Sequence, residues 1–393
     1  MEQSASTKRD HTAIHIAIAA IVIIVIIAIG VIFLKFGISP ANRAIAISTT
    51  ANKIGVNNTT GITGFIYCIG TRAATPVNQV NFAPIYANGS LGGWNATSPY
   101  PYFMYGLGCV VNNDYIYCMP AGPAPQNATA NTTTATYYAK MTPQGIPEWI
   151  KTTPYPIPLS QAICTNPYDN ITYCVGTASG NQTEGRRVFY AKLTSNGIGN
   201  FTGTTPYPVP FAAARCSTYE GYVYCIGNLY PQFANRTYRS KILSSGGLGG
   251  WNITQTAPYP GQLFASGCLP YGSYLYCVGG INGNETLSFY TSINQSGIGK
   301  WIETTPFPVP HLGVPCTISR EGYIYCIGNG YRVSAPKTVP STSSALPPVG
   351  FIYGNESYYA ELTDNGIGEW HSTTKYPVGL AFAACIVNNT ESG

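Results

Sequence analysis

A pattern of about fifty residues recurs six times along this chain of 393 residues, and it limits the possible folds more than any other feature. Each copy holds a string close to IYCIG, followed by one close to NGIGxW. The cysteines of the first string lie 50, 56, 51, 52 and 49 residues apart, at Cys68, Cys118, Cys174, Cys225, Cys277 and Cys326. The second string ends on Trp94, Trp149, Phe201, Trp251, Trp301 and Trp370. A period of this length predicts a repeat architecture.

Each copy is expected to form four short strands. In the copy around Cys225 we predict strands at 212–218, 222–227, 237–243 and 251–255, because runs of β-branched and aromatic residues alternate there with Gly, Pro and Asn. Four strands in about fifty residues are typical of one propeller blade. The sequence therefore predicts an all-β fold, a six-bladed β-propeller.

The repeat resembles that of the kelch family. The strings AAARCSTY, EGY, VYCIGN, TYRSKIL, WNITQ and TTPYPVP match, in order, the strands, turn and exit loop of a kelch blade. The resemblance covers residues 61–387 and implies six kelch-like blades. Three features depart from the family pattern. The family's double glycine after the second strand occurs only at Gly279-Gly280, and Met119-Pro120 replaces Ile-Gly in another copy. The family's usual arginine after the exit-loop proline is missing. Ligand chemistry tied to those residues does not carry over.

Ten of the twelve cysteines fall into five local pairs. In the pair Cys216/Cys225 the midpoint lies between Glu220 and Gly221, so a two-residue turn places the cysteines directly opposite each other, within disulfide reach. The pairs Cys164/Cys174 and Cys316/Cys326 each enclose one more residue, and in each we expect a three-residue turn with a bulge. The five pairs are Cys109/Cys118, Cys164/Cys174, Cys216/Cys225, Cys268/Cys277 and Cys316/Cys326.

A metal site is the alternative interpretation of the cysteines. Zinc sites usually show CxxC spacing, often with histidine, and the chain after residue 35 has neither that spacing nor more than two histidines, His311 and His371. We therefore expect structural disulfides, no metal and no cofactor.

Two cysteines remain, near the two ends of the repeat region. Cys68 lies in a second strand that has no first strand before it, and Cys385 lies in a first strand that has no second strand after it. We predict that the strand at 380–387 completes the first blade and that Cys68 and Cys385 form a disulfide. Such closure removes two exposed sheet edges.

An apolar segment precedes the repeats. Ile16 to Leu34 are nineteen residues without a charge, and a helix of this length covers roughly 28 Å, about one bilayer core. A cleaved signal peptide is the alternative, although its apolar region is normally about 7–15 residues long. We predict a cytoplasmic tail at 1–11, a transmembrane anchor at 12–35, a linker at 36–60 and the propeller at 61–387.

Glycosylation acceptors and cysteines indicate the orientation of this anchor. All twelve cysteines follow it, which is typical of an oxidising compartment. Fifteen Asn-X-Ser/Thr acceptors also follow it: Asn57, Asn58, Asn88, Asn95, Asn127, Asn131, Asn170, Asn181, Asn200, Asn235, Asn252, Asn284, Asn294, Asn355 and Asn388. We expect a single-pass protein of the cell membrane, with an extracellular glycosylated domain. Only 9% of the chain's residues are charged, so the glycans would supply hydration that charges do not.

The charge pattern argues against a nucleic-acid partner. The formal net charge is only +5, and the chain contains no basic cluster able to neutralise many phosphates.

Candidate binding residues are those that break the repeat. Arg186, Arg187, Arg236 and Arg332 lie on or beside the variable connections between second and third strands, where propellers usually bind ligands. Arg215 lies on an innermost strand, and His311 replaces the Leu or Phe of other copies, so either side chain could reach the central channel. Solvated loop charges and hydrogen-bonded structural roles are the alternatives.

A recurring aromatic position allows two interpretations as well. Rings between prolines can stack on sugars, but recurrence in all six copies favours packing between blades. The set is Tyr100, Tyr155, Tyr207, Tyr259, Phe307 and Tyr376.

These observations favour a binding or adhesion module for surface glycans or surface proteins. The first alternative is a carbohydrate-active enzyme with a site near His311 and Arg215, either similar to a six-bladed epimerase of sialic acid or to a propeller oxidase. The epimerase's catalytic residues have no counterparts that can be placed here, and an oxidase needs converging histidine and tyrosine ligands. The second alternative is a structural envelope component. Neither the ligand nor the oligomeric state can be read from the residues.

The predicted topology has a direct test. Protease added outside intact cells should digest the C-terminal domain and leave a small N-terminal fragment in the membrane, because only the domain is exposed. Immunoblotting of membranes for an N-terminal tag measures this. A mature protein that begins near Ile47 would contradict a retained anchor.

Overall fold

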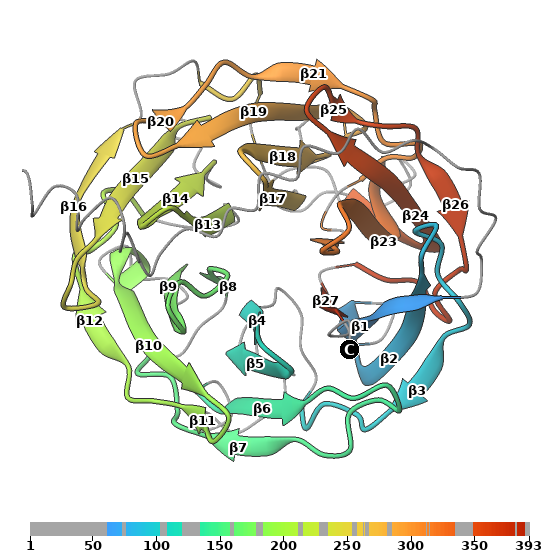
Figure 1. Cartoon of the computed structure of the whole chain (residues 1–393), viewed down its shortest axis with the longest axis horizontal. Helices are drawn as coiled ribbons and strands as arrows, with labels where there is room; N and C mark the ends of the chain where they lie inside the picture. Colours follow the sequence, from blue (N-terminus) through green and yellow to red (C-terminus); the bar gives the residue numbers. More distant parts are fainter. Residues whose placement is uncertain are drawn as a thin grey trace, which may run out of the picture. The chain divides into compact units, whose positions relative to one another are not determined.

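Six antiparallel sheets stand around a common axis and form a closed ring (Figure 1). This computed structural model describes residues 61–72, 76–102, 108–119, 134–157, 161–177, 184–210, 215–227, 235–253, 258–261, 263, 267–280, 285–311, 313, 315–334, 349–381 and 383–389. They belong to one unit, residues 58–393. The six-bladed β-propeller predicted from the repeat is confirmed.

The first three blades contain the chain from β1 to β12. Blade 1 has the order β27 (Ala384–Asn389), β1 (Ile62–Arg72), β2 (Pro76–Tyr86) and β3 (Asn95–Thr97). Blade 2 consists of β4 (Gly108–Asn112), β5 (Tyr115–Met119), β6 (Thr136–Lys140) and β7 (Ile150–Thr152). Blade 3 consists of β8 (Gln161–Cys164), β9 (Ile171–Thr177), the 3-10 helix η2 (Glu184–Arg186), β10 (Val188–Thr194), β11 (Gly197–Ile198) and β12 (Thr202–Thr204).

The remaining blades follow the same order. Blade 4 consists of β13 (Arg215–Tyr219), β14 (Tyr222–Ile226), β15 (Thr237–Ile242) and β16 (Leu248–Ile253). Blade 5 consists of β17 (Gly267–Tyr271), β18 (Tyr274–Val278), β19 (Ser288–Asn294), β20 (Gly297–Ile298) and β21 (Ile302–Thr304). Blade 6 consists of β22 (Cys316–Ile318), β23 (Tyr323–Ser334), β24 (Val349–Thr363), β25 (Gly366–Ile367) and β26 (His371–Thr373).

The predicted strands of blade 4 agree with the structure within a few residues, apart from one. The fourth strand begins at Leu248, three residues before the predicted start. Leu248 is buried, pairs with Ile242, and donates its backbone N–H to the Thr204 hydroxyl of blade 3. These contacts hold the two following glycines in the strand.

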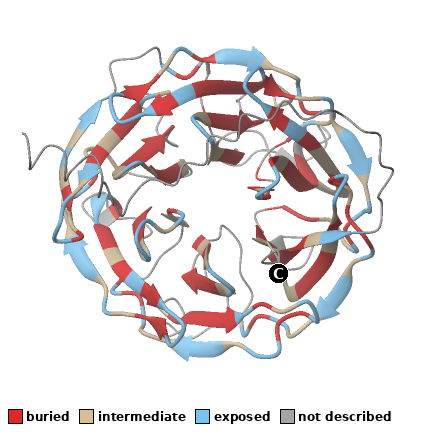
Figure 2. Ribbon diagram, in the orientation of Figure 1, coloured by how far each residue is buried: buried red, intermediate tan, exposed pale blue. Residues whose placement is uncertain are grey.

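The strand order gives the ring two different sides. In an antiparallel sheet the turns after the first and third strands lie at one end, and the connection after the second strand lies at the other. We call these sides the turn face and the loop face; the Pro-rich connections between blades also lie on the loop face. Second and third strands are mostly buried and the outermost strands are mostly exposed (Figure 2).

The hairpin turns on the turn face follow the prediction in two of the three cases considered. In blade 4, Glu220 and Gly221 both have positive φ, as a two-residue turn requires. In blade 6, Gly322 with φ +87° closes the expected three-residue turn. In blade 3 the prediction was wrong, because Tyr168 pairs directly with Ile171 around a two-residue turn.

The extra residue of blade 3 lies between this turn and the disulfide. Cys164 faces Cys174, but the pairing has shifted by one residue where Tyr168 meets Ile171. Pro167 lies within the shifted stretch, and a proline has no N–H to continue the ladder of hydrogen bonds.

All twelve cysteines pair as predicted. Each disulfide joins the first and second strands of one blade, where the two Cα atoms lie 4.0–4.2 Å apart. Cys68 bonds to Cys385, and β1 pairs with β27 in the register Cys68↔Cys385. The C-terminal strand therefore completes blade 1, and it extends to Asn389, two residues beyond the predicted end.

The repeated aromatic residues join neighbouring blades. Each exit-loop ring meets the NGIGxW ring of the next blade edge-on, with centroids 4.8–5.0 Å apart: Tyr376 with Trp94, Tyr100 with Trp149, Tyr155 with Phe201, Tyr207 with Trp251, Tyr259 with Trp301, and Phe307 with Trp370. Six such contacts around the ring explain why this position repeats, since edge-on pairs add to the free energy of burial.

Threonine hydroxyls add a second contact between blades. In each case a hydroxyl at the end of an outermost strand donates to a carbonyl in the turn of the next blade. The pairs are Thr97 to Ile146, Thr153 to Ile198, Thr205 to Leu248, Thr305 to Ile367 and Thr374 to Leu91, at 2.6–2.9 Å. The repeat thus encodes contacts between blades as well as the blades themselves.

The predicted tail, anchor and linker lie outside the described residues. Within the described part of the chain, no helix has the length and apolar character to span a bilayer.

The closing disulfide should stabilise the ring more than a hairpin disulfide does. In the chain-entropy model its loop of about 318 residues corresponds to about 6 kcal/mol, against about 3 kcal/mol for the Cys216–Cys225 loop, as upper figures. The Cys68→Ala/Cys385→Ala variant should therefore unfold at a lower guanidinium concentration than its matched control, Cys216→Ala/Cys225→Ala. Equal midpoints would contradict this prediction.

Candidate functional site

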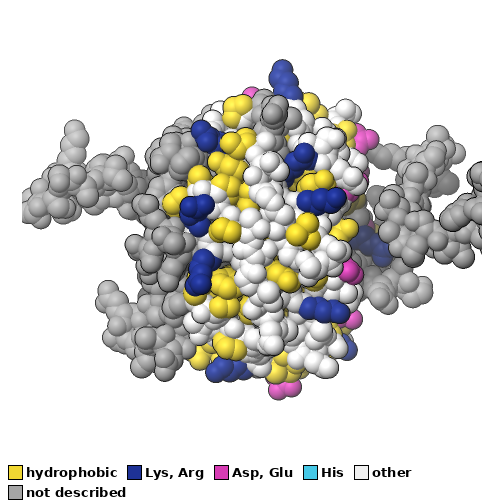
Figure 3. All heavy atoms as spheres, turned by 90° about the vertical axis from the view of Figure 1, so that its left-hand side faces the viewer, with side chains coloured by type: hydrophobic (Ala, Val, Ile, Leu, Met, Phe, Trp, Pro, Cys, Tyr) yellow, Lys and Arg dark blue, Asp and Glu magenta, His cyan; other side chains and the backbone are white. Residues whose placement is uncertain are grey.

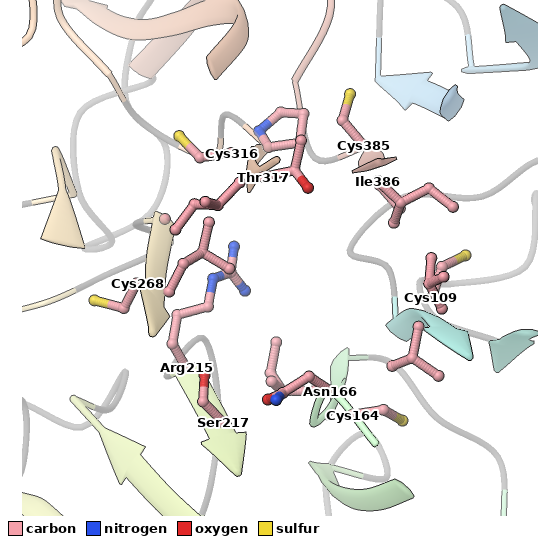
Figure 4. Close-up of a pocket in the computed structure, with 18 of the residues that line it drawn as sticks. Cys109, Cys164, Asn166, Arg215, Ser217, Cys268, Cys316, Thr317, Cys385 and Ile386 are labelled. Carbon is pink, nitrogen blue, oxygen red and sulfur yellow. The ribbon is translucent and has the colours of Figure 1, made fainter. Parts of the chain in front are cut away.

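A cavity of about 360 Å³ lies on the axis of the ring, and residues of the innermost strands of all six blades line it. The first cysteine of every blade lies on this wall, at Cys109, Cys164, Cys216, Cys268, Cys316 and Cys385. Figure 4 shows the sulfurs directed away from the cavity, toward the second strands. The disulfides therefore hold the wall in place without presenting sulfur to a ligand.

The wall of the cavity is mostly apolar. Val110, Leu269, Pro270 and Ile386 are among its residues. The polar side chains among the described lining residues are Asn166, Arg215, Ser217 and Thr317. Arg215 is the only charged one of them. The Asn166 amide already binds the backbone of Thr218, at 2.9 Å through its oxygen. A ligand in this cavity would meet a wall that is more apolar than polar, with one cation and three neutral polar side chains.

Arg215 occupies a position that no other blade fills with a charge. The residue before the first cysteine is Gly108, Ile163, Gly267, Pro315 or Ala384 in the other blades. Figure 4 shows the Arg215 guanidinium extending into the cavity from β13. Burial lowers the pKa of Arg215 to about 10, so the side chain remains cationic at neutral pH.

His311 lies near Arg215 but behind the wall. Its ring is fully buried, and it contacts Phe307 edge-on, with centroids 4.5 Å apart. Gly279 leaves room for it, because a Cβ at Gly279 would lie 2.5 Å from His311 Cδ2. On the other side, His311 Nε2 lies 3.4 Å from Cys316 Sγ. Sequence reasoning placed Arg215 and His311 near the channel, and the structure brings Arg215 alone into it.

His311 is neutral in this environment. Burial lowers the pKa of His311 to about 3, and the nearby Arg215 charge acts in the same direction. Its Nδ1 has no hydrogen-bond partner among the described residues. A buried neutral histidine without access to the cavity is poorly placed for acid–base catalysis on a ligand there.

His311, Cys316 and Cys326 bring three potential metal-ligand atoms, one ring nitrogen and two sulfurs, within 4.8 Å of one another. The two sulfurs, however, are bonded to each other. A metal binds cysteine as the thiolate, which the disulfide does not offer. This group is therefore a disulfide with a neighbouring histidine.

The other predicted binding residues lie on the loop face, apart from the cavity. Arg186 and Arg187 are exposed on blade 3, where Arg186 Nε donates to the Tyr207 carbonyl at 2.8 Å and Arg187 lies 5.7 Å from the centroid of the Phe189 ring. Arg236 is exposed at the start of β15 in blade 4. Arg332 lies on β23 of blade 6, and its side chain is outside the described atoms.

Arg186, Arg187 and Arg236 form what we call the arginine group, on neighbouring blades. Figure 3 views the ring from the side on which β10, β12 and β16 lie. The outer surface of the ring is largely uncharged there, and basic side chains lie among hydrophobic ones. The described acidic residues of the loop face are Glu184 in η2 of blade 3, Glu285 in blade 5 and Glu356 in blade 6. Over blades 3 and 4 the three arginines therefore outnumber the single acidic residue.

The repeated aromatic set is not a platform for sugars. Its six rings are at most 2% exposed and pack between blades. Of the two interpretations of this set, packing is the one that the structure supports.

Sequence reasoning missed most of the cavity wall. Ser217 and Thr317 directly follow the first cysteines of their blades, and Gly267 directly precedes one. The signal that identifies a lining position is that it directly precedes or follows the first cysteine of its blade. This signal can be used only once the strand with that cysteine is known to be the innermost one.

These features define a six-bladed β-propeller whose blades are each cross-linked by a disulfide. Disulfides in this number are typical of proteins in an oxidising environment. No protein-family model matches the chain, and no curated protein matches its sequence. Among solved structures the fold is similar to that of YjhT, with a TM-score of 0.52 and 12% sequence identity, over 73% of this chain and 88% of that one. At this identity the likeness shows the fold alone. The propeller is thus established, and membership of the kelch family is not.

The low pKa of His311 predicts how stability changes with pH. The folded protein leaves His311 unprotonated while the unfolded chain protonates it below about pH 6.5, so the free energy of unfolding falls by about 1.4 kcal/mol per pH unit from there toward pH 3. The His311→Leu variant lacks this group, so its free energy of unfolding should rise relative to that of the wild type by about 1.4 kcal/mol for each pH unit below about 6.5. Urea unfolding at several pH values measures the difference. The exposed His371→Gln is the matched control, and parallel curves for wild type and His311→Leu would contradict the prediction.

Proposed function

We propose that this propeller is a binding module of the outer cell surface, held by the apolar segment at 12–35, and that its loop face binds surface glycans or surface proteins. The observation that carries the proposal is the arginine group, exposed on blades 3 and 4 where the repeat is broken. Elsewhere the repeated residues serve contacts between blades. Loops gathered on one face of a rigid scaffold are where such folds usually bind.

Charge defines the kind of partner we propose. Arginine guanidinium groups bind carboxylate, sulfate and phosphate through paired hydrogen bonds. Acidic glycans and acidic protein surfaces both present such groups. The hairpin turns of the turn face carry more acidic than basic residues: Asp114, Asp169, Glu220, Glu321 and Asp364 against Arg320.

A rigid ring suits this role. Six disulfides and the repeated contacts between blades hold the strands from which the loop face extends in place before a partner arrives. Preorganisation reduces the loss of conformational entropy on binding. The enzyme alternative places catalysis near His311 and Arg215, and the burial of His311 favours binding over it.

The proposal is tested by reversing charge on each face. The Arg187→Glu/Arg236→Glu variant should lose about tenfold in affinity for its glycan or protein partner, because exposed charge pairs contribute up to about 1 kcal/mol each. Arg186 is left in place because its side chain braces the Tyr207 carbonyl. Glycan arrays and binding to intact cells, both with the full-length protein, supply the measurement.

The matched control is Arg320→Glu, an exposed arginine in a hairpin turn of the turn face. Its affinity should equal that of the wild type. An equal loss in both variants would contradict a loop-face site. Self-assembly into sheets without binding to glycans or cells would favour the structural envelope component, and turnover of a bound glycan that His311→Ala abolishes would favour the enzyme.

A further inference from the structure

We propose that the central cavity binds a small amphiphilic monoanion, with one carboxylate on the Arg215 guanidinium and a hydrocarbon body against the apolar wall. This site goes beyond the surface binding proposed above. It lies on the axis of the ring, whereas the arginine group lies on the loop face.

The size of the cavity suits a small molecule. Its volume of about 360 Å³ lies within the range of about 300–1,000 Å³ that is typical of ligand sites. A short chain or a single ring therefore fits inside it.

The charge of the wall selects one negative group. Arg215 is the only charged side chain among the described lining residues, and none of them is acidic. One guanidinium compensates one carboxylate in a paired geometry. A second negative charge would be desolvated against hydrocarbon without a cation, which is strongly unfavourable.

The rest of the wall selects hydrocarbon rather than sugar. Val110, Leu269, Pro270 and Ile386 offer no hydrogen bonds from their side chains. A sugar acid would bring several hydroxyl groups, and besides Arg215 the described lining side chains offer them only Asn166, Ser217 and Thr317 as polar partners, of which Asn166 already bonds to the Thr218 backbone. An alkyl or aryl body instead gains from the burial of its apolar surface.

The position of Arg215 is fixed by its strand. Its backbone faces Ile226, and the next residue, Cys216, is bonded to Cys225. In the neighbouring blade, Gly267 lies so close to Cys316 that a Cβ there would be 2.8 Å from the sulfur. Strand pairing and the adjacent disulfide therefore hold the backbone of Arg215 in place, and blades 5 and 6 are in close contact beside it.

The test uses full-length, oxidised protein in lipid nanodiscs, with empty nanodiscs as the blank. Calorimetry compares two acids, octanoate and phenylbutyrate, with their neutral amides and with suberate, which carries a carboxylate at both ends. We expect saturable binding of an acid at one site per chain. The amide and suberate should each bind about 10–100-fold more weakly, as expected for the loss of a charged hydrogen bond or the burial of an unpaired charge.

Variants assign the effect to the residue. Arg215→Gln should reduce the affinity for the acid about 10–100-fold and leave that for the amide unchanged. The matched control Arg187→Gln removes an exposed arginine of the loop face and should change neither. The Arg187→Glu/Arg236→Glu variant should also bind the acid normally, which separates this site from the proposed surface function.

A pH titration of the unmodified protein gives a second readout that does not depend on the folding of a variant. Acid binding should weaken as the pH falls through the carboxyl pKa of the probe, near 4–5, while amide binding stays constant. The proposal is overturned if no acid binds saturably, if acid and amide bind equally, if suberate binds more tightly than octanoate, or if folded Arg215→Gln retains full affinity for the acid.

Discussion

The contact between neighbouring blades is the constraint on which the rest of this structure depends. A ring of six sheets closes only if every blade meets the next in a compatible geometry, and here the same few groups recur at these contacts. At all six junctions an exit-loop aromatic ring meets the tryptophan or phenylalanine of the next blade, and at five of them a threonine hydroxyl binds a carbonyl in the adjacent turn. Tyrosines of the second strands add a third contact, as when Tyr117 donates to the Thr194 carbonyl at 2.7 Å. Hydroxyl groups and aromatic rings, rather than charged groups, therefore make these contacts among the described residues.

The fold could be predicted from the sequence because each of these contacts lies within a repeat or between adjacent repeats. Six copies of one pattern gave the blades, and the leftover cysteines at Cys68 and Cys385 gave the closure. One turn could not be predicted: counting residues between Cys164 and Cys174 gave the correct excess but placed it in the turn, whereas it lies beside Pro167. The number of residues between two paired cysteines shows how many are extra. Where the extra residue lies depends on local backbone chemistry, here the missing N–H of Pro167.

The candidate site could be predicted only in part, for a related reason. Arg215 and His311 stood out because each breaks the repeat, but Arg215 comes from blade 4 and His311 from the connection between blades 5 and 6, so their proximity depends on the assembled ring. Sequence could not show that Gly279 admits the His311 ring behind the wall while Arg215 projects through it. Two deviations of equal prominence in the sequence thus have different roles. One faces the cavity, and the other fills a space in the core.

The closure of blade 1 also determines how the ring responds to a mechanical load. A force applied to the chain before Ile62 enters at β1, which lies between β27 and β2 inside a sheet rather than at its edge. Such a force shears two hydrogen-bonded strands at once, whereas an edge strand would peel away one bond at a time. Beyond Cys68 the covalent bond to Cys385 carries the tension to the other end of the domain. A domain tethered through its N-terminal segment would therefore keep its ring intact under tension until that strand has been pulled out as far as the disulfide.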